Sequence, residues 1–380
     1  MIGAGKAAAS MAVAVDRHWP GSLSGRVITR YGHGLPCDRI QVVEAAHPVP
    51  DDAGLRATAQ MLDRLHGLTA DDLVLCLMSG GGSALLAAPA PGLTLADKQQ
   101  ITSALLKSGA SITEMNSVRK HLSAVKGGRL ARMAAPAPIH TLLISDVPGD
   151  DPATIASGPT LPDPSTRADA LATLARYDIN TPPAVIDWLS NPASETPKSP
   201  ADLPPSRAVL IATPADAIAA AARLALQMGV APLFLGSAIE GEARTVAARH
   251  AEFVASVLDG RIPAPRPCVL LSGGETSVTV RGSGRGGRNA EFMLALAIAL
   301  AGRPGVYALA ADTDGIDGVQ DNAGAWIGPD ILSRAVTAGL SAADRLTDND
   351  GYGFFQNAGG LLFTGPTRTN VNDFRAILIE

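Results

Sequence analysis

The feature that most constrains this chain is a series of short apolar runs, each ending in glycine, serine or aspartate, which alternate with alanine- and leucine-rich stretches. Buried strands form such continuous apolar runs, and longer periodic stretches are typical of the helices that cover a sheet. The alternation predicts an α/β protein. The predicted strands are Val27–Thr29, Gln41–Glu44, Leu73–Met78, Thr141–Ile144, Ala208–Ala212, Ala231–Leu235, Val269–Leu271, Ser277–Val280, Val306–Ala310 and Leu361–Thr364. The predicted helices are Lys6–Asp16, Asp51–Leu65, Thr94–Gly109, Asp216–Met228, Glu240–Leu258, Asn289–Ala301 and Asp330–Ala338.

A proline-rich segment, 191–206, interrupts this pattern. Proline cannot donate to a strand ladder or continue a helix, so we interpret this segment as an exposed connection. The chain has 380 residues, which suggests two domains at roughly 100–200 residues per domain. We expect one domain at 1–203 and a second at 204–380, with its core from about residue 267. A second proline-rich break, at 261–267, is the alternative boundary or the edge of a subdomain.

Composition excludes several classes of protein. The net charge of −5 argues against nucleic-acid binding, which favours a clustered basic surface. No apolar run reaches the roughly 18 residues that a membrane-spanning helix needs, and the first 15 residues do not resemble a signal peptide. The three cysteines are far apart and form neither a zinc motif nor a disulfide framework, which favours the cytoplasm.

The strongest local signal is the glycine-rich bend that follows the predicted strand Leu73–Met78. Glycines let backbone N–H groups approach an anion closely, and ligands of open α/β sheets bind at the carboxyl ends of strands. We therefore interpret this bend as a phosphate- or carboxylate-binding loop; the alternative is a tight turn without a ligand. Its candidate residues are Ser79, Gly80, Gly81, Gly82 and Ser83.

Two further glycine-rich segments could bind anions. Gly273, Gly274 and Glu275 follow the strand Val269–Leu271, although a turn between two strands explains them nearly as well. The segment 281–292 contains GxGxxG and carries Arg285 and Arg288, whose guanidinium groups suit phosphate or carboxylate. Asn289 could cap the helix that begins there. The alternative for this segment is a solvated basic loop.

Carboxylates gather after two other predicted strands. Asp312 and Asp314 follow Val306–Ala310, and Asp146 follows Thr141–Ile144. Carboxylate oxygens in this position suit Mg²⁺ bound together with phosphate, or a base, while aspartate and glycine also form ordinary turns. The basic segment 115–131 reads as a solvated helix face, with an anion contact as the alternative.

The first residues, Gly3-Ala4-Gly5-Lys6-Ala7-Ala8, match the GxGxxA variant of the dinucleotide fingerprint. No acidic residue lies about 20 positions further on to bind a ribose, so a nicotinamide cofactor is a weak interpretation. No P-loop, HExxH zinc motif or GxSxG elbow is present. Lys6 opens a predicted helix, where a cation opposes the helix dipole unless an anion lies beside it.

Together and in this order, ten motifs resemble the class II glycerate kinases, the glycerate 2-kinase family with a C-terminal MOFRL domain. The motifs are GAGKAA at 3–8, HPVPD at 47–51, SGGGSALL at 79–86, NSVRKHLSAVKGGRLA at 116–131, SDVPGDDPATIASGPT at 145–160, GEA at 241–243, SGGET at 272–276, GGRNAEF at 286–292, ADTDGIDG at 311–318 and TGPTRTNVND at 364–373. Relatives are often labelled hydroxypyruvate reductase. Members of the family usually have several tens of residues before the GAGK motif. They also usually carry an acidic residue in the segment that corresponds to Ala358–Gly360 of this chain.

The resemblance implies ATP-dependent phosphorylation of D-glycerate at its 2-hydroxyl with Mg²⁺, in a cleft between a Rossmann-like N-terminal domain and a smaller α/β domain. It also implies that Lys6 and Arg288 are catalytic cations. We expect Asp312 or Asp314 to orient or deprotonate the hydroxyl, and Asp146, Asp312 and Asp314 to bind Mg²⁺. The alternative function is an NAD(P)H-dependent hydroxypyruvate reductase. A homodimer is one candidate for the oligomeric state. The remaining candidate binding residues are Gly5, Gly273, Gly274, Glu275, Arg285, Asn289 and Asn370.

Overall fold

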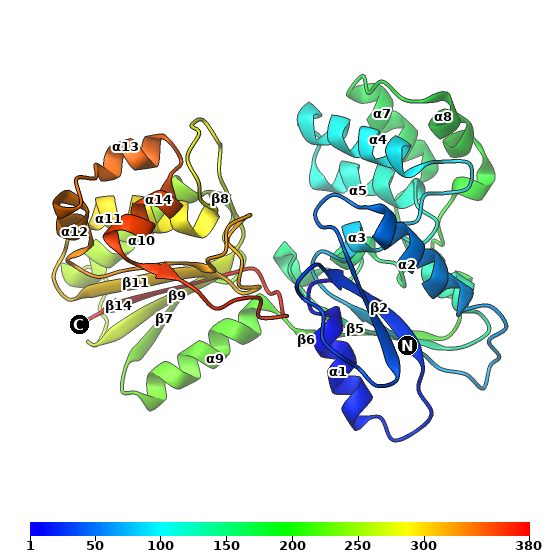
Figure 1. Ribbon diagram of the computed structural model, residues 1–380, viewed down its shortest axis with the longest axis horizontal. Helices are drawn as coiled ribbons and strands as arrows, with labels where there is room; N and C mark the ends of the chain where they lie inside the picture. Colours follow the sequence, from blue (N-terminus) through cyan, green and yellow to red (C-terminus); the bar gives the residue numbers. More distant parts are fainter. The chain divides into compact units, whose positions relative to one another are not determined.

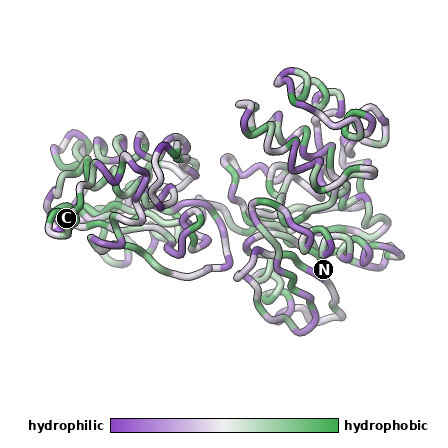
Figure 2. Tube along the Cα trace, turned by 45° about the horizontal axis from the view of Figure 1, so that its top comes forward, coloured by the Kyte–Doolittle hydropathy of each residue, from purple (hydrophilic) through white to green (hydrophobic).

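A computed structural model describes residues 1–380, and contacts between Cα atoms divide it into two compact units, Met1–Ile211 and Ala212–Glu380 (Figure 1). Both units combine a six-stranded sheet with helices, so the α/β prediction is confirmed. Hydrophobic stretches run through both units, and each has its own buried core (Figure 2). No helix has the combination of length and apolar character that spanning a membrane would require.

The sheet of the first unit has the strand order β3-β2-β1-β4-β5-β6. Its strands are β1 (Ile2–Ala4), β2 (Gly25–Arg30), β3 (Ile40–Ala45), β4 (Val74–Met78), β5 (Ile139–Ile144) and β6 (Ser206–Ala212). The pairs from β3 to β5 are all parallel. This is the doubly wound order of Rossmann folds, in which the order of strands in the sheet reverses between β1 and β4.

Helices of the first unit pack in two groups. Those close to the sheet include α1 (Ala8–His18), α2 (Asp52–Asp63), α3 (Gly82–Leu85) and α6 (Arg129–Ala134). A second hydrophobic cluster joins α4 (Leu95–Ser108), α5 (Ile112–His121), α7 (Arg167–Arg176) and α8 (Pro183–Ser190), which lie together in Figure 1. Serine or threonine begins three of these four helices and accepts a hydrogen bond from the backbone of the first turn.

The boundary between the units lies after Ile211, whereas the sequence predicts it between residues 203 and 204. The reason is β6, which follows the proline-rich segment in sequence but forms the edge strand of the first sheet. Pro-rich segments indicate where regular structure stops, and they do not determine which sheet the next strand joins.

The sheet of the second unit is mixed, with the order β13-β12-β11-β14-β9-β7. Its strands are β7 (Ala231–Gly236), β9 (Cys268–Gly274), β11 (Val306–Asp312), β12 (Gly324–Ile327), β13 (Leu361–Leu362) and β14 (Asp373–Ile379). Only β7 and β9 pair in parallel. The helices are α9 (Pro214–Gln227), α10 (Ala243–Leu258), α11 (Arg288–Leu300), α12 (Ile331–Thr337), α13 (Ala342–Thr347) and α14 (Gly351–Ala358).

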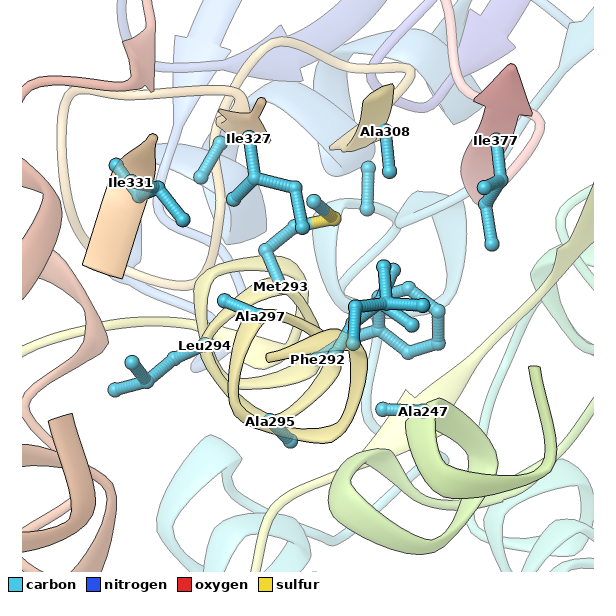
Figure 3. Close-up of a cluster of buried hydrophobic side chains, with 14 of the residues drawn as sticks. Ala247, Phe292, Met293, Leu294, Ala295, Ala297, Ala308, Ile327, Ile331 and Ile377 are labelled. Carbon is cyan, nitrogen blue, oxygen red and sulfur yellow. The ribbon is translucent and has the colours of Figure 1, made fainter. Parts of the chain in front are cut away.

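Helix α11 is the centre of the second unit. Its side chains are buried nearly all the way round, and Figure 3 shows Phe292, Met293 and Leu294 pointing away from its axis in different directions. A helix that is apolar on every side is buried on every side. The N-terminal turn of this helix, which begins at Arg288, is therefore held rigidly.

One predicted strand, Ser277–Val280, is wrong. Only the two-residue strand β10 (Thr276–Ser277) forms there, paired with β8 (Gly241–Glu242). The backbone N–H and the hydroxyl of Thr279 both donate to the carboxylate of Glu242, at 3.0 and 3.1 Å. This side-chain carboxylate takes the hydrogen bonds that a longer strand would have given to a neighbouring backbone.

Candidate active site

Two predicted loops of the first unit meet at the point where the strand order reverses. Gly5 and Lys6 follow β1, and Ser79 follows β4, its neighbour in the sheet. The N–H of Lys6 donates to the carbonyl of Gly80 at 2.8 Å, and the Ser79 hydroxyl oxygen accepts from the N–H of Ala7 at 3.0 Å. Ligands of doubly wound sheets bind at this reversal, outside the carboxyl ends of the strands.

Glycine at position 5 is required by this meeting. Gly5 has a φ of +140°, and a Cβ atom there would lie 2.1 Å from the hydroxyl oxygen of Ser79. The spacing that resembles a dinucleotide fingerprint therefore has a packing role, the close approach of the two loops.

The side chains of Lys6 and His47 flank the glycine bend. A Cβ atom at Gly81 would lie 3.1 Å from Nε2 of His47 and 3.4 Å from Cγ of Lys6. His47 follows β3, at the same edge of the sheet as Lys6 and the bend. Its motif was noted in the sequence, but the residue was not predicted for the site; its position just after a strand was the available signal.

Asp146 lies two residues beyond β5, the next strand of the sheet, and its side chain is half-buried. Since β1, β4 and β5 run parallel, their carboxyl ends share one edge. The first unit thus places a lysine, a glycine-rich bend and an aspartate along this edge of the sheet.

In the second unit, carboxylates surround Arg288. Its Nε donates to Asp373 at 2.8 Å and its Nη2 to Asp312 at 2.7 Å, while Nη1 lies 3.6 Å from Glu275. Burial by itself would lower the pKa of Arg288, but the charges of Asp373, Asp312 and Glu275 outweigh burial and raise it. Arg288 is thus a permanently charged, oriented group, and one-fifth of its side chain is accessible to solvent.

Asp373 is the residue on which this cluster depends. Its Oδ1 accepts from Arg288 and, at 2.8 Å, from Nδ2 of Asn289, while its Oδ2 accepts from Arg375 at 2.7 Å. Both Asp373 and Arg375 are fully buried. Neither was predicted for the site, because no apolar pattern was recognised for β14, the strand that carries them.

Asp317 caps the helix on which Arg288 and Asn289 lie. Its carboxylate accepts from the backbone N–H groups of Asn289 at 3.0 Å and Ala290 at 2.8 Å. Burial raises the pKa of Asp317 to about 6, against the lowering effect of these two hydrogen bonds. The sequence assigned the cap to Asn289, but Asn289 lies inside the first turn of the helix and binds Asp373 instead.

Asp312 and Asp314 are both buried at the end of β11. Oδ1 of Asp312 accepts from the N–H of Asp314 at 3.0 Å, and Oδ1 of Asp314 accepts from the N–H of Ile316 at 2.8 Å. The loop that contains Asn370 lies beside them, because Val371 donates to the hydroxyl oxygen of Thr313 at 2.8 Å. No group of three or more His, Cys, Asp or Glu side chains is arranged to hold a metal ion.

Of the other predicted residues, Arg285 lies apart from these clusters, whereas Gly274 pairs with Asp373 across β9 and β14. Arg285 binds Gln356 at 3.0 Å and stacks over the ring of Tyr352 at 4.7 Å, so its side chain lies on α14. Gly274 ends β9 with a φ of +122°, and a Cβ atom there would lie 2.2 Å from the backbone nitrogen of Ile239. Gly273 and Gly274 therefore allow two segments to pack closely.

A cavity of about 230 Å³ opens beside Arg288 in the second unit. One wall consists of glycines from the loop that precedes α11, and another of the apolar side chains Val278 and Val280. Its remaining lining residues include Glu291, whose pKa is raised by burial. The cavity offers a charged end at Arg288 and an apolar wall.

Comparison with known proteins gives two family matches. Residues 1–190 match a domain of unknown function, DUF4147, and residues 268–373 match the MOFRL family. A protein of Agrobacterium vitis with the provisional name hydroxypyruvate reductase is 52% identical, over 100% of this chain and 86% of its own length. The D-glycerate 2-kinase of Thermotoga maritima is 41% identical over 98% of this chain and 88% of its own. A crystal structure of glycerate kinase from the same organism matches with a TM-score of 0.91 at 41% identity, covering 100% of this chain and 91% of that chain.

Proposed function

Since the chain belongs to the glycerate 2-kinase family with a C-terminal MOFRL region, we propose that it transfers the γ-phosphoryl group of ATP to the 2-hydroxyl of D-glycerate. The observation that carries this proposal is the juxtaposition of Lys6 with the bend 79–83 where the strand order reverses. The family matches also confirm the resemblance drawn from the ten sequence motifs.

In this reaction the 2-hydroxyl oxygen forms a bond to the γ-phosphorus, the bond from that phosphorus to the β,γ-bridging oxygen breaks, and ADP leaves. The enzyme has to position the reactants and neutralise charge on the transferring group. We assign charge neutralisation to Lys6 and Arg288. Asp312, oriented by Arg288, would orient the hydroxyl of glycerate or accept its proton.

Magnesium fits the residues of the first unit. Mg²⁺ is usually held by one or two carboxylates together with substrate phosphates. Asp146, at the edge shared with Lys6 and the bend, would supply such a carboxylate, and Asp312 and Asp314 are the candidates in the second unit. When bound, the ion would neutralise charge on the phosphate oxygens.

The three cysteines, Cys37, Cys76 and Cys268, are all free thiols. Free thiols are typical of a reducing compartment, so we propose a cytoplasmic location.

The decisive experiment is an assay that identifies the product. The protein is incubated with ATP, Mg²⁺ and D-glycerate, and the product is passed to enolase, which accepts 2-phosphoglycerate but not 3-phosphoglycerate. We expect phosphoenolpyruvate without added phosphoglycerate mutase. A requirement for the mutase would show phosphorylation at the 3-hydroxyl. No phosphorylation, together with oxidation of NADH or NADPH by hydroxypyruvate, would favour the reductase.

A further inference from the structure

Three cations of the first unit lie close together without a carboxylate partner. Lys98 on α4 and Arg119 on α5 are half-buried and form no ion pair or hydrogen bond. Lys126 precedes α6 and is 3% exposed. Its ammonium group donates to the carbonyl of Ser83 at 2.6 Å and to the hydroxyl of Ser83 at 2.9 Å.

The pKa values of Lys98 and Lys126 are lowered by burial and by the positive charges around them. Burial lowers the pKa of Lys98 to about 8, with a further contribution from Arg119. Burial and then the positive charges of Lys98, Arg119 and Lys120 lower the pKa of Lys126. Like charges brought together away from water destabilise a fold unless an anion compensates them.

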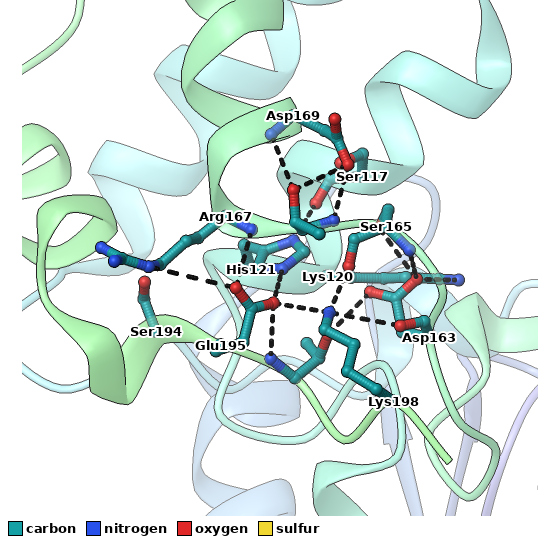
Figure 4. Close-up of polar contacts among 12 residues, drawn as sticks. Ser117, Lys120, His121, Asp163, Ser165, Arg167, Asp169, Ser194, Glu195 and Lys198 are labelled. Carbon is teal, nitrogen blue, oxygen red and sulfur yellow. Dashed lines mark hydrogen bonds and ion pairs between the residues drawn. The ribbon is translucent and has the colours of Figure 1, made fainter.

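Two neighbouring cations, Lys120 and Lys198, do have carboxylate partners. Figure 4 shows Lys120 beside Asp163 at 3.2 Å, and Lys198 beside Glu195 at 2.5 Å, within one polar network. The fold therefore supplies carboxylates to Lys120 and Lys198, while Lys98 and Arg119 receive none. A ligand that carries the missing negative charge is the simplest reason for the difference.

Two serine hydroxyls complete the cluster. The Oγ atoms of Ser83 and Ser157 lie 2.8 Å apart, and Ser83 is the last residue of the bend that Lys6 flanks. Ser157 adopts a left-handed conformation with a φ of +64°, and its carbonyl accepts from the N–H of Gly127 at 3.1 Å. Such strained positions persist where the surrounding structure requires them, often at ligand sites.

We propose that Lys98, Arg119 and Lys126, with the hydroxyls of Ser83 and Ser157, bind the polyphosphate chain of the nucleotide. The inference rests on the proposed function and assigns the nucleotide phosphates to the first unit. A glycerate carboxylate carries one negative charge and would leave most of the positive charge uncompensated, whereas a polyphosphate carries several.

The test measures binding of inorganic tripolyphosphate and of D-glycerate separately, by calorimetry, to the full-length protein and to Lys98→Gln, Arg119→Gln and the double variant. Lys107→Gln is the matched control, because Lys107 lies exposed on the same helix as Lys98. We expect each substitution to raise the dissociation constant of tripolyphosphate about tenfold, while Lys107→Gln leaves it unchanged. Lys98→Arg and Arg119→Lys should keep most of the affinity.

Three results would overturn the proposal. The first is that the wild type does not bind tripolyphosphate. The second is that Lys98→Gln, Arg119→Gln and Lys107→Gln bind it with equal affinity. The third is that Lys98→Gln and Arg119→Gln bind D-glycerate more weakly while their affinity for tripolyphosphate is unchanged. Circular dichroism shows whether each variant is folded. If the double variant does not fold, the two single variants test the proposal. The kinase assay is independent: tripolyphosphate binding that depends on Lys98, without kinase activity, would retain this site and refute the proposed function.

Discussion

At the scale of single residues, the two proposed catalytic cations are held by different parts of the fold. Arg288 is held by Asp312 and Asp373, so its orientation is set before any substrate arrives. Lys6 lies against the glycine bend, with its Cγ atom beside Gly81. A substitution at Arg288 therefore disturbs buried carboxylates as well as the reaction.

We predict that Lys6→Ala lowers kcat about a hundredfold, the usual cost of removing one group that stabilises transition-state charge. We expect the variant to fold, because the backbone hydrogen bonds of Lys6 are kept, and circular dichroism checks this. The measurement is steady-state phosphorylation of D-glycerate, with Lys107→Ala as the control. An unchanged kcat would remove Lys6 from the mechanism.

Asp373→Asn is predicted to destabilise the second unit by about 3–5 kcal/mol, the usual cost of breaking a buried ion pair. Asparagine keeps the shape of the side chain but leaves Arg288 and the fully buried Arg375 without the carboxylate they share. Urea denaturation measures the change, and the exposed Asp344→Asn serves as the control. A loss as small as that of the control would contradict the central position given to Asp373.

Asp317 is predicted to make stability depend on pH. Its pKa is about 6 in the folded protein, above the ordinary 3.8, so the unfolded chain ionises first as pH rises. The free energy of unfolding of the wild type, relative to Asp317→Asn, should therefore decrease between about pH 4 and pH 6 and then level off. Denaturation of both proteins across this range provides the measurement, and a difference that rises with pH would refute the assignment.

At the scale of elements, short side-chain motifs determine where helices begin. Thr213 and Asp216 form such a motif at α9: the Thr213 hydroxyl accepts from the N–H of Asp216 at 3.3 Å, and the carboxylate of Asp216 accepts from Thr213 at 2.9 and 2.7 Å. These bonds satisfy backbone groups that the helix itself leaves unpaired. The start of α9 is therefore encoded locally.

Thr213→Ala is predicted to cost about 1 kcal/mol in the free energy of unfolding, because the side-chain cap is lost. Thr213→Ser keeps the hydroxyl and should stay close to the wild type. Chemical denaturation of the three proteins compares them; equal losses for alanine and serine would show that the hydroxyl does not act as a cap.

At the scale of the whole molecule, the hydrophobic clusters are built within separate stretches of chain, 1–211 and 212–380. Chains with more than one such core commonly depart from two-state unfolding. Ligand binding stabilises the part that binds it, by about 2.7 kcal/mol at a hundredfold excess over the dissociation constant.

We predict two unfolding transitions in scanning calorimetry, and tripolyphosphate should raise the midpoint temperature of only one of them. Asp373→Asn should lower the midpoint temperature of the other transition, which identifies that transition as unfolding of the second unit. A single transition that moves as a whole with both perturbations would contradict separate unfolding, and a shift of the transition that Asp373→Asn lowers would assign tripolyphosphate to the second unit.

The sequence alone determined the fold class, most of the strands and the position of the glycine-rich bend 79–83. Apolar runs, glycines and helix starts are local features, and their physical effects act over a few residues. Ten motifs in order were also sufficient to indicate the family.

Only the tertiary structure decided which residues share a site. Asp373 reaches Arg288 across 85 positions of sequence, through a strand pairing that has no local signature. Asp317 became the cap of α11 because buried groups must find partners wherever the fold brings them, and the exposed Arg285 lies over Tyr352 of α14. The cluster of Lys98, Arg119 and Lys126 also depends on the packing of α4 against α5, since electrostatic interactions act through space rather than along the chain.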